Sequence, residues 1–343
     1  MAKKHRLTLQ DIADELHLSK VTISKALRDH PDISLETKQA VEATAQRLGY
    51  LPNFMARNLS ARQSNTIGVV VPKIAHNFFA TVIEAIYETA YENKYEIILT
   101  VSQENPENEI KHLQTLLSMR VDGLLISVSE HTKDRSIYET VKQLNVPLVF
   151  FDRSLSGLGF SSVCTDDELG ARQATEYLIS RGYSKIAHCA GYSHTNIGKD
   201  RRDGFTKTLA AHDLSARDEW IVEGGFSEED GYNGFKNLIK SPVLPEAIFS
   251  VTYPVALGIY AAASEHGIKI PGDIDIVCFG ASSYQRFFSP SITFVRQPAE
   301  ELGRRALELL VDEIRNPESL RPQLITLPTE LVLSEDHTNE GVT

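Results

Sequence analysis

Residues 8–27 read TLQDIADELHLSKVTISKAL, and this stretch decides the N-terminal fold. Apolar residues recur at helical spacing across residues 9–16, and Thr8 can cap that helix. Ser19 then caps a second short helix across residues 20–27, so only a tight turn separates the two helices. This arrangement predicts a helix-turn-helix, whose second helix projects from the surface and fits the major groove of B-DNA, about 12 Å wide.

The rest of the N-terminal segment completes a small basic domain. A third helix is predicted after the loop, because Ser34 can cap its start and Gly49 can end it after Leu48. The first 62 residues carry 10 basic and 7 acidic residues, a net charge of +3, whereas the remainder carries 25 basic and 39 acidic residues, a net charge of −14. A basic end on an acidic body suggests that one module contacts a polyanion, although ordinary surface scatter is the alternative.

The N-terminal end of the second helix carries side chains suited to DNA. They are Lys20, Val21, Thr22, Ser24 and Lys25. Lysine can donate to O6 and N7 of guanine, valine can contact a thymine methyl group, and the two hydroxyls can bond phosphate oxygens. The alternative is a solvated helix face in a small bundle that never touches DNA.

Bulk composition excludes several classes of protein. With 343 residues, 42% of them hydrophobic, the chain can form a small domain and a larger body with its own core. Cys164, Cys189 and Cys278 share no short spacing, which predicts neither disulfides nor a thiolate metal site. The N-terminus lacks the apolar run of a signal peptide, and no later stretch holds about 18 uninterrupted apolar residues. We therefore expect a cytoplasmic protein without a membrane span.

The body alternates short apolar runs with amphipathic segments, such as the helix predicted across residues 78–92. The runs lie at residues 67–71, 95–100, 123–127, 147–152, 185–190 and 247–251. Runs rich in Val, Ile and Leu that are separated by helices are typical of parallel strands covered on both faces. No Gly-rich phosphate loop follows the first run, and no paired metal-ligand motif or Gly-x-Ser-x-Gly elbow occurs, so we expect no enzyme, cofactor or metal.

Six stretches of the chain carry a family resemblance. The runs LQDIA (9–13), LSKVTISKAL (18–27) and LGYLPN (48–53) resemble the headpiece of the LacI/GalR (lactose-repressor) family of bacterial regulators. The resemblance continues through ARNL (56–59), TIGVVVP (66–72) and VRQPAEELG (295–303). It implies an all-α helix-turn-helix headpiece plus an α/β periplasmic-binding-protein-like core of two parallel-sheet lobes.

Domain boundaries follow from these patterns. We expect a headpiece at 1–52, a hinge helix and linker at 53–64, a two-lobed effector-binding and dimerisation domain at 65–336 and a tail at 337–343. The first lobe would combine 65–164 with 291–321, and the second 165–290 with 322–336.

The resemblance also assigns DNA-contacting roles. It implies that Lys20, Val21 and Lys25 read bases, and that Leu59 of a hinge helix wedges into the minor groove. The residues implied to hold the DNA backbone are Thr8, Ser19, Thr22, Ser24, Tyr50 and Asn53. A core position is the alternative for Leu59. The family usually has arginine where Lys25 stands, and lysine lacks the bidentate fork that fixes a guanine, so the operator sequence cannot be carried over.

A ligand of parallel sheets settles outside the carboxyl ends of the strands. The residues that this rule and the resemblance select together are Phe78, Phe79, Ser127, Asp152, Arg201, Phe226, Tyr253 and Gly280. Alternatively, the phenylalanines are core residues and Arg201 pairs with an acid such as Asp203. Tyr253 and Gly280 stand where the family commonly has aspartates, which favours an anionic ligand over a neutral sugar.

These observations predict a transcriptional regulator, with repression as the family's usual mode. It would bind a palindromic double-stranded DNA operator as a homodimer, with affinity controlled by a sugar, a sugar derivative or an anionic metabolite in the interlobe cleft. The alternatives are a solute-binding protein with the periplasmic-binding fold, or a regulator controlled by a partner protein.

Overall fold

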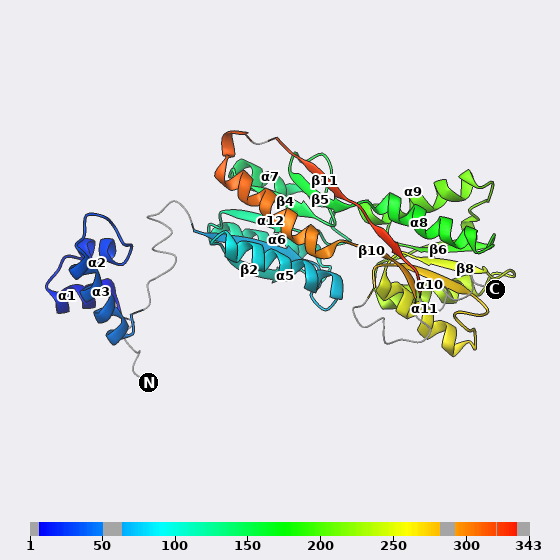
Figure 1. The fold of residues 1–343 in the computed structure, drawn as a ribbon, viewed down its shortest axis with the longest axis horizontal. Helices are drawn as coiled ribbons and strands as arrows, with labels where there is room; N and C mark the ends of the chain where they lie inside the picture. The colour runs from blue at the N-terminus through cyan, green and yellow to red at the C-terminus, as the bar shows by residue number, and fades with distance from the viewer. Residues whose placement is uncertain (1–6, 51–63, 282–291, 320, 335–343) are drawn as a thin grey trace. The chain divides into compact units, whose positions relative to one another are not determined.

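The chain divides into two compact units, residues 1–64 and 65–343. The computed structural model describes residues 7–50, 64–281, 292–319 and 321–334, which are drawn as coloured ribbon in Figure 1.

The first unit is a three-helix bundle with α1 (Leu9–Leu16), α2 (Lys20–Ala26) and α3 (Leu35–Leu48). Its capping residues are those predicted from the sequence. Thr8 and Asp11 form a capping box at α1, Ser19 and Ser34 cap α2 and α3 through their side chains, and Gly49 ends α3 with a φ of +73°. Ile12, Ile23 and Val41 contribute one fully buried side chain from each helix, so the three helices share one core.

The second unit contains two six-stranded sheets, each the centre of one lobe. The first sheet has the order β11-β5-β4-β3-β1-β2, and the second has the order β12-β10-β9-β8-β6-β7. The strands of the first lobe are β1 (Thr66–Val71), β2 (Glu96–Val101), β3 (Gly123–Ile126), β4 (Leu148–Phe151), β5 (Ser161–Thr165) and β11 (Leu324–Leu327). Those of the second lobe are β6 (Ile186–Ala190), β7 (Ile221–Glu223), β8 (Ala247–Ser250), β9 (Asp275–Phe279), β10 (Thr293–Arg296) and β12 (Glu330–Val332).

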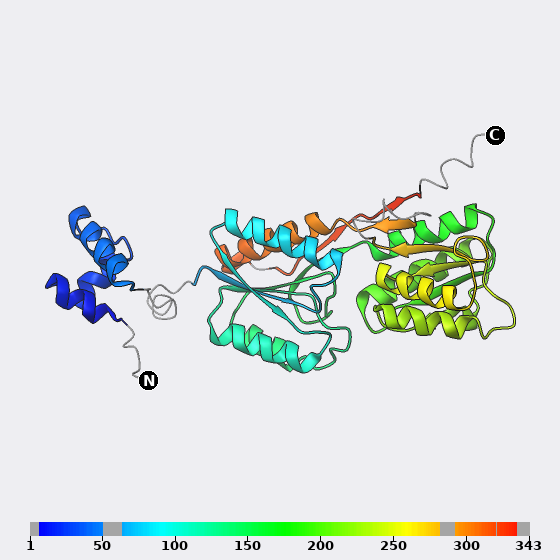
Figure 2. The same cartoon turned by 90° about the horizontal axis from the view of Figure 1, so that it is seen from below.

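Helices cover both faces of each sheet, as Figure 2 shows for the two lobes. The helices of the first lobe are α5 (Asn77–Glu92), α6 (Pro106–Ser118), α7 (Ser136–Gln143) and α12 (Ala299–Arg315). Those of the second lobe are α8 (Asp167–Ser180), α9 (Asn196–Ala211), α10 (Glu228–Leu238) and α11 (Tyr253–Glu265), with 3₁₀ turns η1 (Asp218–Trp220) and η3 (Pro317–Ser319) elsewhere in the chain. Along β1, Val69 packs with α5 and α12 while Val70 packs with α6 and α7, which explains the unbroken apolar run. The predicted fold class is confirmed.

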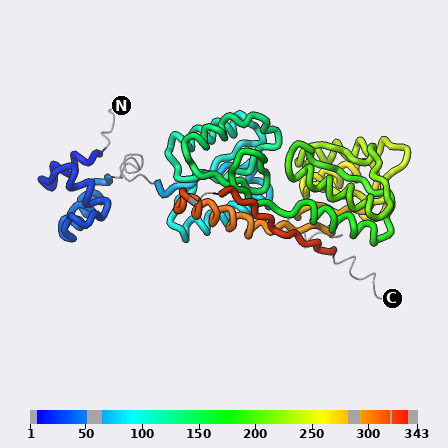
Figure 3. The backbone as a smooth tube through the Cα atoms, turned by 90° about the horizontal axis from the view of Figure 1, so that it is seen from above, coloured from blue at the N-terminus to red at the C-terminus, as the bar shows by residue number. Residues whose placement is uncertain are grey.

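The chain passes between the lobes after β5, after β10 and after β11, and Figure 3 shows its red C-terminal segment running from the first lobe to the second. The predicted lobe assignment was wrong for two strands, because β10 lies in the second sheet and β11 in the first. The strand β10 pairs in parallel with β9 of the second sheet, and β11 pairs in parallel with β5 of the first sheet. The crossings then fall near Pro298 and Pro328, which lack the N–H that a continuing strand needs.

His188 in β6 is a fully buried histidine with an aromatic environment. Its ring stacks on Phe249 at 4.7 Å between centroids and lies 5.1 Å from Phe205, and its Nδ1 donates to the Phe249 carbonyl at 2.9 Å. Burial lowers the pKa of His188 to about 4. The protein therefore holds this side chain neutral at pH 7.

This histidine predicts a loss of stability in mild acid. Its folded-state pKa lies below the unfolded value, so the unfolded chain takes up the proton first, and the stabilisation present above about pH 6.5 is lost as the pH falls towards 4. Between pH 7 and pH 5 the loss is about 2 kcal/mol in the free energy of unfolding. Urea unfolding can be followed by the fluorescence of Trp220, the single tryptophan, which is buried in the second lobe.

The control for this prediction is His188→Phe, which keeps an aromatic ring between Phe249 and Phe205. Other titrating groups contribute equally to both proteins, so the difference in pH dependence isolates His188. An identical loss in wild type and variant would contradict the prediction.

Candidate functional site

The N-terminal end of α2 presents the predicted base-reading side chains on one face. Ile23 and Ala26 are buried in the bundle, so Val21 lies on the opposite, outer face of α2, where its side chain is 65% exposed. Lys20 is exposed beside Val21, and Lys25 lies one helical turn further along on the same face. This face therefore offers two ammonium donors and one apolar contact to a groove.

The hydroxyls predicted to hold the DNA backbone are already engaged at helix starts. Ser19 Oγ accepts a hydrogen bond from the Thr22 backbone N–H at 3.0 Å and lies 2.8 Å from Thr22 Oγ1. Thr8 Oγ1 donates to Asp11 Oδ2 at 2.8 Å. These contacts orient the first turns, whose N–H groups favour anions such as phosphate.

Of the other residues predicted to contact DNA, two lie in the described headpiece and two do not. Ser24 is half-buried on α2, and its carbonyl accepts a hydrogen bond from Arg28 Nε at 3.0 Å. Tyr50 packs against the bundle core directly after α3. Asn53 and Leu59 lie outside the described residues.

A cavity of about 530 Å³ lies between the lobes, at the carboxyl ends of the parallel strands. Its size suits a small molecule. Seven of the eight residues predicted for the effector line it: Phe78, Phe79, Asp152, Arg201, Phe226, Tyr253 and Gly280. The eighth, Ser127, is buried and stands behind Asp152, with its Oγ 3.5 Å from Asp152 Oδ2.

The aromatic lining residues also belong to the hydrophobic core. Phe79 is buried against α12, and Phe78 packs beside it edge to face with 5.2 Å between ring centroids. Phe226 is buried in the core of the second lobe. The core and ligand interpretations of Phe78 and Phe79 are thus compatible, since each ring touches both the core and the cavity.

Asp152 is a buried carboxyl on the cavity wall. It follows β4 with a φ of +59°, a conformation rare for residues other than glycine. Burial raises the pKa of Asp152 to about 6, against the opposing effect of Arg153 and Arg201. Its carboxyl can therefore switch between accepting and donating a hydrogen bond near neutral pH.

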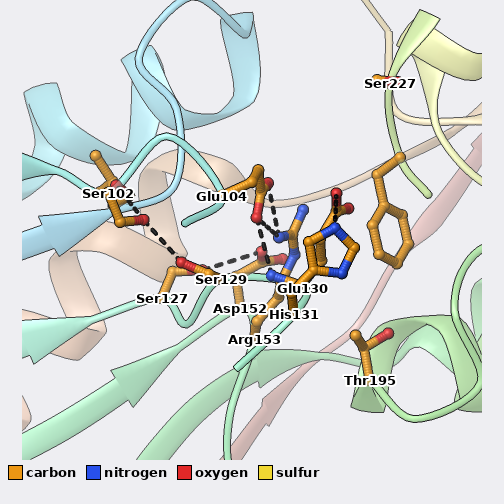
Figure 4. A network of polar contacts seen from close by, with 12 residues as sticks. Ser102, Glu104, Ser127, Ser129, Glu130, His131, Asp152, Arg153, Thr195 and Ser227 are labelled. Atoms are coloured by element: carbon orange, nitrogen blue, oxygen red, sulfur yellow. Dashed lines mark hydrogen bonds and ion pairs between the residues drawn. The ribbon is translucent and has the colours of Figure 1, made fainter. Parts of the chain in front are cut away.

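Arg153 joins the cavity to the loop after β3, as Figure 4 shows. Its Nη1 lies 2.9 Å from both carboxylate oxygens of Glu104, and Glu104 Oε2 accepts the backbone N–H of Glu130 at 2.9 Å. The Arg153 guanidinium also lies 4.7 Å from the centre of the Phe226 ring in the other lobe. Arg153 is thus both a cavity residue and a bridge between the lobes.

Arg201 is anchored at the second-lobe side of the cavity and is only 1% exposed. Its Nε and Nη2 lie 2.8 and 2.7 Å from Asp167 Oδ1, and its Nη1 donates to the Val251 carbonyl at 2.7 Å. The guanidinium stacks 3.7 Å above the Phe279 ring. The pairing with Asp203 considered above was wrong, because Asp203 pairs with Lys199 and the partner of Arg201 comes from α8.

Other side chains close the rim of the cleft. Asn196 at the start of α9 donates to the Asp152 carbonyl at 2.9 Å and accepts the Ser154 N–H at 3.1 Å. His194 Nε2 lies 2.6 Å from the Glu130 carbonyl. These contacts link the two lobes at the edge of the cleft.

Two cavity positions lack the acids that the family resemblance would supply. Tyr253 begins α11, and Gly280 follows β9 with a φ of +76°. That backbone conformation favours glycine, and a Cβ there would lie 3.2 Å from Gln297 Oε1. In the described parts of the chain, no cluster of three or more histidine, cysteine or acidic residues could hold a metal ion, and no helix is long and apolar enough to cross a membrane.

Comparison with known families decides the affiliation of the chain. Residues 8–53 match the family described as bacterial regulatory proteins of the lacI family, and residues 64–334 match the periplasmic binding proteins and sugar binding domain of the LacI family. The chain belongs to the LacI family. It is therefore a DNA-binding regulator with a ligand-binding domain.

Individual relatives of this LacI-family chain are named as transcriptional repressors or regulators. It is 32% identical over 327 residues to the HTH-type transcriptional repressor PurR of Actinobacillus pleuropneumoniae, covering 95% of this chain and 97% of the relative. Among solved structures, the lac repressor dimer bound to operator and the anti-inducer ONPF is 25% identical, with a TM-score of 0.81, covering 96% of this chain and 98% of the other. The CelR–cellobiose complex is 26% identical, with a TM-score of 0.73, covering 96% and 99%.

Several residues that line the cavity of this LacI-family chain were not among those predicted from its sequence. Arg153, Phe279 and Glu228 line the cavity as well. Arg153 directly follows Asp152 after β4 and Phe279 ends β9, so the strand-end rule carried a signal for both. Glu228 comes from the first turn of α10, which has no such signal in the sequence.

Proposed function

We propose that the chain is a sequence-specific transcriptional repressor that binds a palindromic operator as a homodimer, under the control of a neutral polar molecule in the interlobe cleft. The exposed face of α2 with Lys20, Val21 and Lys25 is the observation that carries the DNA-binding part. A helix of this length contacts too little DNA for tight binding alone, which favours two headpieces on a two-fold symmetric site.

An exposed surface on the first lobe supports the dimer. Tyr87 and Tyr91 lie four residues apart on α5 and are 58% and 76% exposed. Leu99 is exposed on β2, the edge strand of the same sheet. Exposed aromatic residues next to an open strand edge favour burial against a second copy of the chain.

The ion pairs of the cleft support a neutral ligand. Arg153 is paired with Glu104, and Arg201 is paired with Asp167. Among the described residues that line the cavity, Asp152 and Glu228 add acidic groups that no further lysine or arginine balances. An anionic ligand would therefore meet little uncompensated positive charge, whereas hydroxyl groups can use both the acceptors and the guanidinium N–H groups. The ring of Phe226 supplies an apolar surface.

Recovery of bound duplexes from a random-sequence pool tests the DNA-binding proposal. We expect the full-length protein to select one two-fold symmetric motif, and Lys20→Ala to weaken binding to that motif by about tenfold or more, because one base contact is worth about 1–3 kcal/mol. The charge-matched control is Lys111→Ala, an exposed lysine on α6 of the other unit, which should bind like wild type. Failure of the wild type to select any motif, with or without added small molecules, would contradict the proposal.

A further inference from the structure

Lys25 occupies a position where a lysine alone is a poor reader of bases. Its ammonium is a point charge at the end of four rotatable carbons, whereas an arginine fork presents two fixed donors. Val21, one turn earlier on α2, is exposed to the same side. A lysine on this face needs a restraint if it is to discriminate guanine sharply.

Asp32 supplies a restraint in the free headpiece. Its Oδ2 accepts a hydrogen bond from Lys25 Nζ at 2.9 Å, across the turn that follows α2. This turn contains Pro31, whose ring fixes φ, and the Asp32 backbone N–H lies 3.3 Å from His30 Nδ1. The hydrogen bond from Lys25 lowers the pKa of Asp32, so the carboxyl is ionised at neutral pH.

We propose that Asp32 is a positioning residue for operator recognition, which holds the Lys25 ammonium so that its two remaining N–H donors reach O6 and N7 of a guanine. An ammonium has three donors, and Asp32 occupies one of them. Two donors are the number that a guanine edge accepts in the major groove. This inference rests on the proposed function, in which α2 reads an operator.

The same carboxylate has a second effect on DNA binding. It cancels the charge of Lys25 and places a negative group at the surface that meets phosphates. Binding to random DNA depends mainly on phosphate contacts, whereas binding to the operator also gains from the oriented base contact. Asp32 should therefore raise the ratio of operator affinity to random-DNA affinity, because it weakens binding to random DNA and strengthens the base contact at the operator.

The turn offers a matched control. Asp29 pairs with Lys38 at 2.6 Å, only three residues before Asp32. Lys38 belongs to α3 and its side chain is mostly buried, so this pair does not lie on the exposed face of α2. Asp29→Asn removes the same charge from the same turn without touching Lys25.

The test compares binding of full-length variants to two duplexes, the one selected by the wild type and a random duplex of equal length. Each base pair of a half-site is replaced in turn, and Lys25→Met identifies the guanine whose substitution penalty disappears. We expect this penalty to be about tenfold in the wild type. In Asp32→Asn the penalty for replacing this guanine should be nearly as small as in Lys25→Met, while the affinity for random DNA rises. Asp29→Asn should keep the penalty.

A second substitution that restores the guanine penalty would show that Asp32 acts by positioning Lys25 and not by stabilising the headpiece. Lys25→Arg combined with Asp32→Asn should restore the guanine penalty, because arginine carries its own fork. Three results would overturn the inference: a full penalty in Asp32→Asn, an equal decrease in Asp29→Asn, or no guanine whose penalty depends on Lys25. A cytosine preference lost only in Asp32→Asn would also overturn it, since Asp32 would then read a base directly. A wild type that selects no motif would instead contradict the proposed function itself.

Discussion

Arg201→Met is expected to lower the free energy of unfolding of the second lobe by about 3 kcal/mol or more at pH 7. The guanidinium connects Asp167 at the start of α8, the Val251 carbonyl after β8 and the Phe279 ring at the end of β9. Methionine fills much of the volume but leaves the Asp167 carboxyl buried without its cation and the carbonyl without its donor. Urea unfolding followed by Trp220 fluorescence measures the loss.

The dependence on pH identifies the cause of this loss. Burial raises the pKa of Asp167, and Arg201 opposes that rise. Without Arg201 the folded-state pKa rises further, so folded Asp167 takes up a proton more readily than the unfolded chain does, and the variant recovers stability as the pH falls from 7 to 5. The gap to wild type should therefore narrow in mild acid. Adding Asp167→Asn to Arg201→Met should remove the buried charge and recover part of the stability at pH 7.

The neighbouring Arg202 provides the control. Its Nη1 pairs with Glu223 Oε2 at 3.2 Å, and both side chains are well exposed. Exposed ion pairs contribute about 0–1 kcal/mol, so Arg202→Met should change the free energy of unfolding by less than that. If Arg202→Met lowered the free energy of unfolding as much as Arg201→Met, the buried contacts of Arg201 with Asp167, Val251 and Phe279 would not explain the loss.

Contacts between residues close together in the chain could be predicted from the sequence, whereas contacts between residues far apart in the chain could not. The helix starts at Thr8, Ser19 and Ser34 depend on residues three positions away, and all three were predicted. The partner of Arg201 could not be predicted, since Asp167 is 34 residues away and only the packing of α8 against α9 brings the two together. The nearby Asp203 looked equally suitable in the sequence.

The lobe assignment failed for a related reason. The strands β10 and β11 are short, and their sequences do not specify which sheet edge they join. Conversely, seven of the eight residues selected by the strand-end rule together with the resemblance do line the cavity, because the carboxyl ends of parallel strands meet at one edge of each sheet. The charge balance of the cavity did not follow from that rule. It depends on Glu104 and Asp167, which neutralise Arg153 and Arg201 from outside the predicted set.

Gly231→Ala is expected to destabilise the second lobe by about 3 kcal/mol, because α10 and α11 approach each other at glycines. A Cβ at Gly231 would lie 2.0 Å from the Val255 carbonyl oxygen, and one at Gly258 would lie 1.9 Å from the Glu228 carbonyl oxygen. Both obstacles are backbone atoms of a helix, which cannot move aside as a flexible side chain would. The helices must separate, and urea unfolding with Trp220 fluorescence reports the cost.

Gly234→Ala tests whether this cost comes from the contact between the helices or from replacing a glycine. Gly234 lies on the same helix, where a Cβ would meet Val222 Cγ1 at an ordinary 3.6 Å, so the alanine should be neutral or stabilise the lobe by up to about 1 kcal/mol. Similar losses in the two variants would contradict the explanation. The effect should also reach the cavity, because the first turns of α10 and α11 carry Glu228 and Tyr253. Separation of the helices in Gly231→Ala would therefore move two cavity walls apart and weaken ligand binding together with stability.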